Sequence, residues 1–166
     1  MLCSRVMGLL FSSLGISFAL VSLASDFWVV NSHVLFHAGL WRLCIKGNCG
    51  DILSGTEYID ATRAFMILTV VTSFLAIFSA CASFASHLSA KRYGSMGASI
   101  STICSAVFLT IAMAVYTAKT AEIQHVDTLY GWSFFLGWVA FPSFCIAALC
   151  HFLAFRSSPA PGYQNI

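Results

Sequence analysis

Four long stretches of this chain contain no charged residue and no histidine, and they constrain its fold more than any other feature. They comprise residues 6–25, 64–86, 93–118 and 128–150. About 20 apolar residues in a helix, at about 1.5 Å each, cross a hydrocarbon layer roughly 30 Å thick. The strands of a transmembrane barrel would be about 10 residues long and would alternate apolar and polar side chains. The pattern therefore predicts four transmembrane helices.

The composition excludes most soluble classes of protein. Hydrophobic residues make up 59% of the chain and charged residues 8%, against roughly 45–50% and about 25% in a soluble domain. The net charge of +2 is too small to attract a polyanion. We therefore expect a lipid bilayer around the chain, with no nucleic acid and no small-molecule substrate as partner. The sequence contains no P-loop, nucleophile–base pair or metal-ligand cluster, so we expect no catalytic residue, no cofactor and no metal site.

The first uncharged stretch has some features of a signal peptide. Arg5 precedes it, and small residues occur at its end. Its apolar core of about 18 residues, however, exceeds the 7–15 residues that are usual for a signal peptide. We expect a retained helix.

The distribution of charges predicts the orientation. One side of the membrane would carry Arg5, Lys91, Arg92 and Arg156, and the other Arg42, Lys46, Arg63, Lys119 and all six acidic residues. Basic residues in the short turn 87–92 resist translocation more than those in the 38-residue loop 26–63. We therefore expect both termini in the cytoplasm, with the loops 26–63 and 119–127 outside the cell or in a lumen. The transmembrane domain would comprise residues 1–156.

The first outer loop contains two cysteines. Cys44 and Cys49 are separated by four residues, including Gly47 and Asn48, which suit a tight hairpin turn. Thiols on the oxidising side of a membrane form disulfides, so the spacing predicts a Cys44–Cys49 bond between two strands.

Two tryptophans precede this part of the loop. Trp28 directly follows the first helix, and the preference of tryptophan for the membrane–water interface would explain its presence there. Trp41 lies mid-loop, where we expect a contact with the core of the loop or with the membrane.

These residues resemble the signature of a known family. Trp28, then Gly39, Leu40 and Trp41, then Cys44 and Cys49 follow the W, GLW, C, C pattern of the claudin, peripheral myelin protein and lens fibre membrane protein superfamily. Arg63, within residues 61–66, resembles the arginine at the start of that family's second helix. The resemblance implies a mainly α membrane protein: a left-handed four-helix bundle with a small extracytoplasmic antiparallel β-sheet. Its strands would come from the first loop and from the end of the third-helix segment.

Other stretches resemble the natural-killer-granule branch of this family. They are residues 26–28, 50–52 with 54–55, 112–117, and 132–134 with 136–139, and the lens fibre protein shares several of them. This resemblance implies a protein of cytotoxic or lysosome-related granules that supports granule trafficking and exocytosis by lymphocytes. It would act through lateral contacts with other membrane proteins, including a second copy of itself. The alternative is a junction or adhesion protein of the plasma membrane, similar to a claudin or the lens fibre protein.

Residues 157–166 are expected to form a cytoplasmic tail. Pro159 and Pro161 favour an extended linker. Gly162, Tyr163 and Ile166 match the Gly-Tyr-x-x-Φ pattern, where Φ is apolar, and resemble the sorting signals of lysosomal membrane glycoproteins. Clathrin adaptor subunits bind such a peptide as an added strand, with pockets for Tyr163 and Ile166. A tail without function and a PDZ ligand are the alternatives.

Two further cysteines are candidates for modification. Cys3 and Cys150 lie near the predicted cytoplasmic ends of helices, where thiols are reversibly palmitoylated. Thiols with no role beyond packing are the alternative.

Overall fold

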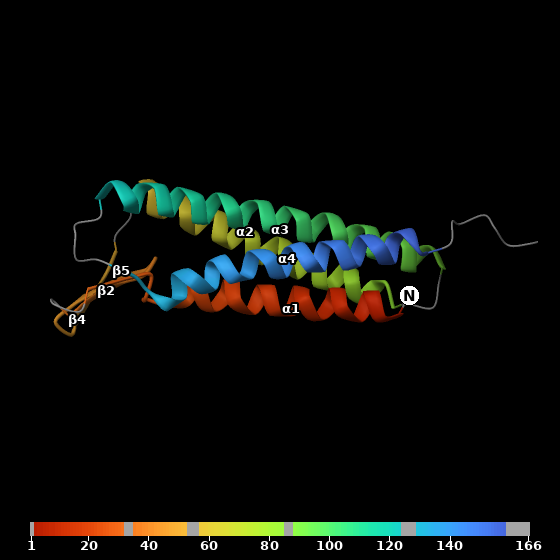
Figure 1. Ribbon diagram of the computed structural model, residues 1–166, viewed down its shortest axis with the longest axis horizontal. Coiled ribbons are helices and arrows are strands. Elements are labelled where there is room, and N and C mark those ends of the chain that lie inside the picture. The colour runs from red at the N-terminus through yellow and green to blue at the C-terminus, as the bar shows by residue number, and fades with distance from the viewer. Residues whose placement is uncertain (1, 32–34, 53–56, 85–87, 124–128, 159–166) are drawn as a thin grey trace, which may run out of the picture.

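Four long helices form a bundle with a small sheet at one end (Figure 1). The computed structural model describes residues 2–31, 35–52, 57–84, 88–123 and 129–158. The helices are α1 (Leu2–Ala24), α2 (Glu57–Ala82), α3 (Leu88–Ile123) and α4 (Trp132–Arg156). Each is long and apolar enough to cross a membrane. The N-terminus and the end of α4 lie opposite the sheet (Figure 1). The predicted fold class is confirmed.

The helices extend beyond the uncharged stretches. α2 begins at Glu57, so the first outer loop is shorter than the predicted 26–63. Glu57 and Asp60 occupy the first turn of α2, where their negative charge stabilises the positive end of the helix dipole. α3 continues to Ile123, and Lys119 pairs with Glu122 one turn later at 2.9 Å. Residues 119–123 of the predicted 119–127 loop are therefore helical. Charged residues can continue a helix outside the hydrocarbon layer.

Small residues let the helices pack closely. α1 packs against α4, and α2 packs against α3. Gly8 faces His151, and an added Cβ would lie 2.6 Å from the ring. Gly15 faces Phe144 in the same way, with its Cβ 2.8 Å from that ring. The buried faces thus consist largely of small side chains, as is typical of helices that associate in lipid.

The sheet has five antiparallel strands in the order β4-β3-β2-β1-β5. They are β1 (Val29–Asn31), β2 (Phe36–Ala38), β3 (Arg42–Ile45), β4 (Asn48–Asp51) and β5 (Leu129–Tyr130). Lys46 and Gly47 join β3 to β4 with positive φ angles of 49° and 84°, as a two-residue type I′ hairpin requires. The prediction of a strand from the end of the third helix is wrong. β5 lies directly before α4 because α3 stays helical to Ile123.

Candidate functional site

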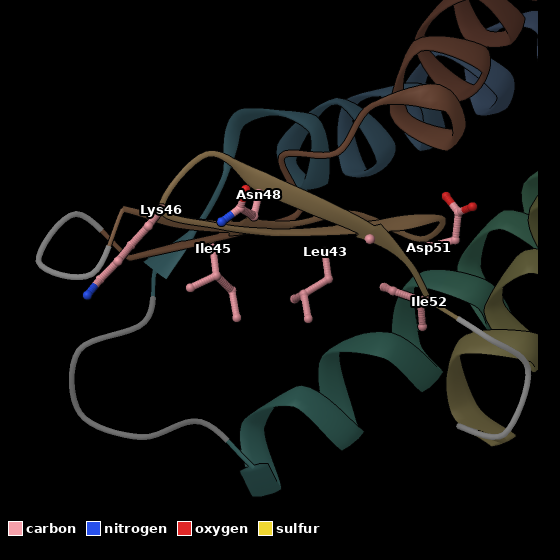
Figure 2. A pocket seen from close by; sticks show the side chains of 7 residues that line it. Leu43, Ile45, Lys46, Asn48, Asp51 and Ile52 are labelled. Carbon is pink, nitrogen blue, oxygen red and sulfur yellow. The ribbon is translucent and has the colours of Figure 1, made fainter.

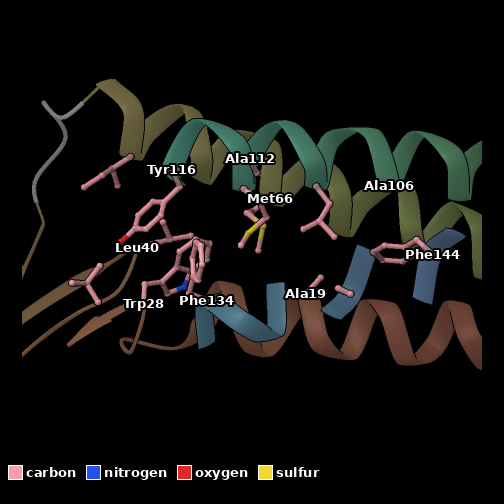
Figure 3. Close-up of a cluster of buried hydrophobic side chains, with 14 residues drawn as sticks. Ala19, Trp28, Leu40, Met66, Ala106, Ala112, Tyr116, Phe134 and Phe144 are labelled. Atoms are coloured by element: carbon pink, nitrogen blue, oxygen red, sulfur yellow. The ribbon is translucent and has the colours of Figure 1, made fainter. Parts of the chain in front are cut away.

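The junction between the sheet and the bundle is built around Trp28. This side chain is fully buried, and its Nε1 donates a hydrogen bond to the carbonyl oxygen of Ser22 at 2.7 Å. Its ring packs edge-on against Tyr116, with centroids 4.6 Å apart, and against Phe134 at 6.0 Å (Figure 3). Packing inside the protein therefore explains the position of Trp28. Trp28 links the end of α1 to α3 and α4, because the aromatic rings of those helices enclose it.

The Gly39–Trp41 segment brings the sheet back onto α1. A Cβ at Gly39 would lie 2.5 Å from the Cα of Asp26, so only glycine fits without moving the backbone. Leu40 is fully buried in the core shown in Figure 3. Trp41 remains 40% exposed, but its Nε1 donates to the carbonyl oxygen of Leu23 at 2.9 Å. The segment therefore docks through backbone and side-chain contacts together.

Arg63 joins the loop to α2. Its Nε donates to the carbonyl oxygen of Leu40 at 2.8 Å, and one Nη donates to that of Ile52 at 3.0 Å. The other Nη pairs with Asp60 at 2.8 Å. The guanidinium also lies over the Trp41 ring, 4.9 Å from its centroid. Arg63 thus fixes both ends of the β3–β4 hairpin to α2, and Asp60 balances its charge.

The predicted disulfide is present. Cys44 and Cys49 are directly opposite in β3 and β4 and are bonded to each other. His37 is opposite Cys44 on β2, and its imidazole lies within 4.8 Å of both sulfur atoms. Zinc binds cysteine as thiolate, so the sulfur atoms of the disulfide are not available as ligands in this state.

An apolar groove lies along the β3–β4 hairpin (Figure 2). Leu43, Ile45 and Ile52 point to the same side and line it, and its volume is about 510 Å³. Lys46 lies at the tip of the hairpin, and Asp51 lies at its other end (Figure 2). This surface offers apolar contacts with charges at each end, which suits binding to another protein rather than catalysis.

The opposite end of the bundle holds a second polar junction. Arg5 of α1 donates to the carbonyl oxygen of Ser83 and to Ser158 Oγ, at 2.5 and 2.9 Å. Arg92 of α3 donates to the carbonyl oxygen of Ser158 at 3.1 Å. These contacts hold Ser158, the second residue after α4, against α1 and α3. The sequence does not predict these contacts, because Arg5 and Ser158 are 153 positions apart and no local pattern connects them.

The two candidate cysteines lie at this same end. Cys3 is exposed, and Cys150 is partly exposed. Ser4, next to Cys3, donates to the carbonyl oxygen of Cys150 at 2.6 Å, so α1 and α4 bring the two candidate thiols to one place. The sorting residues Gly162, Tyr163 and Ile166 lie outside the described part of the chain.

Comparison with known proteins places this architecture in a family. The sequence profile of the PMP-22/EMP/MP20/Claudin family matches residues 2–154. Human Protein NKG7 is 33% identical over 168 aligned positions, covering 98% of each chain. Human lens fiber membrane intrinsic protein is 31% identical and covers 90% of each chain. Mouse claudin domain-containing protein 2 is 32% identical over 71% of this chain and 68% of its own. The chain belongs to the PMP-22/EMP/MP20/Claudin family.

Proposed function

We propose that this chain is a non-enzymatic protein of cytotoxic or lysosome-related granule membranes, which supports granule trafficking and exocytosis in lymphocyte-mediated cytotoxicity. The observation that carries the proposal is the 33% identity with human Protein NKG7 over 98% of both chains. The stretches that resemble the natural-killer-granule branch run from the first loop to α4.

The structure supports a role based on contacts. Apolar side chains cover the outside of the helices, including Phe78 at 75% exposure and Leu149 at 57%. In a bilayer such surfaces meet lipid or the helices of other membrane proteins. The hairpin groove adds a second contact surface outside the membrane. Lateral assembly, including self-association, would then organise other proteins of the granule membrane.

The tail would direct the chain to the granule. With both termini in the cytoplasm, Tyr163 follows Ser158 by five residues, and an extended chain spans about 3.3 Å per residue. The arginine contacts at Ser158 hold the start of the tail at the bundle. An adaptor subunit would therefore meet Tyr163 and Ile166 close to the membrane. Palmitoylation of Cys3 and Cys150 would add lipid anchors at the same end.

The location of the chain tests this proposal. We expect a tagged chain in cytotoxic lymphocytes to accumulate in granules, and Tyr163→Ala to move it to the cell surface, because the adaptor pocket loses its aromatic side chain. Gln164→Ala is the matched control, since this position does not enter a pocket in the Tyr-x-x-Φ mode. It should leave the granule staining unchanged. Staining at cell borders that is the same for all three chains would contradict the proposal.

A plasma-membrane junction or adhesion protein is the second candidate. The similarity to lens fiber membrane intrinsic proteins and the exposed groove on the hairpin favour it. In that role Leu43 and Ile45 would contact a protein on the facing cell. Concentration of the tagged chain at contacts between expressing cells, lost in Leu43→Asp but retained in Tyr163→Ala, would support this candidate over the first.

A further inference from the structure

Two arginines enclose one serine at the end of the bundle that carries both termini. We call Arg5, Ser83, Arg92 and Ser158 the arginine clasp. Arg5 donates to Ser83 and Ser158, and Arg92 donates to Ser158. The Arg92 guanidinium also lies 4.7 Å from the centroid of the Phe155 ring. The clasp thus gathers residues from or directly after all four helices, and it holds two positive charges close together.

The clasp contains positive charge without a matching negative charge. The described acidic residues all lie at the sheet end: Asp26, Asp51, Glu57, Asp60 and Glu122. There Arg42, Arg63 and Lys119 each pair with a carboxylate, at 3.6, 2.8 and 2.9 Å. Among the described residues, the two clasp arginines donate hydrogen bonds to neutral oxygen atoms instead. Like charges held together repel each other, so an anion between them would stabilise the clasp.

One donor in the clasp is still unused. Arg5 Nε is buried and has no hydrogen-bond partner among the described residues. A buried donor without a partner is costly, and guanidinium groups bind phosphate through several parallel N–H groups. The free donor and the uncompensated charge therefore indicate the same kind of ligand, a phosphate group.

The depth of the clasp indicates where that phosphate comes from. The apolar helices that could span a membrane begin at Leu2 in α1 and at Arg92 in α3, so in a bilayer both arginines would lie near the level of the lipid headgroups. Exposed apolar side chains, among them Val6, Met96 and Leu153, continue from the clasp along the helices. A lipid could place its phosphate at the arginines and its acyl chains along these residues. Free phosphate would make no use of the apolar surface.

We propose that the arginine clasp binds the phosphomonoester headgroup of an anionic lipid in the leaflet on its side of the membrane. A phosphomonoester carries a charge of about −1.5 to −2 at neutral pH, which matches two guanidinium groups. A phosphocholine headgroup brings its own cation and would compete poorly. This proposal is independent of the granule function, because it rests only on the charges and contacts at the clasp.

Lipid retention tests the proposal. The full-length chain would be purified in nanodiscs that contain phosphatidylcholine with a minor fraction of phosphatidic acid, and bound lipids would be counted by native mass spectrometry. We expect selective retention of phosphatidic acid and about tenfold weaker retention in Arg92→Gln, since a hydrogen bond to a charged group accounts for a change of that order. Arg42→Gln removes an exposed arginine at the sheet end and should retain the lipid fully.

Further variants separate charge from folding. Ser158→Ala removes the hydroxyl but keeps both arginines, so we expect it to retain phosphatidic acid. Arg92→Lys should recover part of the retention through its charge. Equal retention of the two lipids by the unmodified chain would overturn the proposal, as would equal retention by Arg92→Gln and Arg42→Gln. Displacement of phosphatidic acid by an equal concentration of inorganic phosphate would overturn the assignment to a lipid.

Discussion

At the scale of single residues, the junction depends on side chains that donate hydrogen bonds to backbone carbonyls of neighbouring segments. Trp28, Trp41 and Arg63 each donate to a carbonyl oxygen of another segment. Such bonds satisfy backbone groups at the ends of helices and strands, which would otherwise be costly to bury. The W, GLW and Arg positions of the family motif therefore have one physical role here: they attach the sheet to the bundle.

Arg63 provides the clearest prediction at this scale. Arg63→Gln should lower the free energy of unfolding by about 2 kcal/mol, because the carbonyls of Leu40 and Ile52 lose a charged donor. The thermal unfolding midpoint in detergent would measure this loss. Arg42→Gln is the control, since the Arg42–Asp51 pair is exposed and such pairs contribute little. Equal midpoints for the two variants would show that Arg63 does not anchor the loop.

At the scale of elements, the β3–β4 hairpin is a small unit with its own constraint. Its two-residue turn fixes the register, and the Cys44–Cys49 bond links directly opposite positions. The disulfide closes a short ring, so it constrains the hairpin rather than the whole chain. The hairpin side chains Leu43 and Ile45 then stay in place along the groove.

Removing both cysteines should loosen the hairpin alone. We expect the Cys44→Ser, Cys49→Ser double variant to lose about 2 kcal/mol by the loop-closure model, with faster amide hydrogen exchange in β3 and β4. Exchange in α1–α4 should stay unchanged, because the disulfide links only β3 and β4. Faster exchange throughout the bundle, or no change in the hairpin, would contradict this account.

The sequence predicts some elements of this fold better than others. The four helices follow from hydropathy, and the hairpin follows from Cys44, Gly47 and Cys49. The two-residue strand β5 was misplaced because so short a strand has no recognisable pattern. The start of α2 at Glu57 does not follow from hydropathy. Charged helical residues outside the membrane have the same polar composition as a loop. The arginine clasp could not be predicted, since it joins residues from opposite ends of the chain.

At the scale of the whole molecule, the two ends of the bundle differ in charge and in construction. The sheet end pairs its described arginines Arg42 and Arg63 with carboxylates, and it carries the apolar groove of the β3–β4 hairpin. The clasp end collects positive charge and holds the start of the tail. In the proposed orientation the outer end would meet other proteins, and the inner end would meet anionic lipid and the sorting machinery.

Release of granule contents tests the central proposal most directly. Cytotoxic lymphocytes that lack their own copy of this chain would be supplied with the unmodified chain, Tyr163→Ala or Gln164→Ala, at equal expression. Release of granule contents after contact with target cells would then be measured. We predict that the unmodified chain and Gln164→Ala restore release, and that Tyr163→Ala does not because it fails to reach the granule. Release that is equal with and without the chain, or full restoration by Tyr163→Ala, would contradict the account.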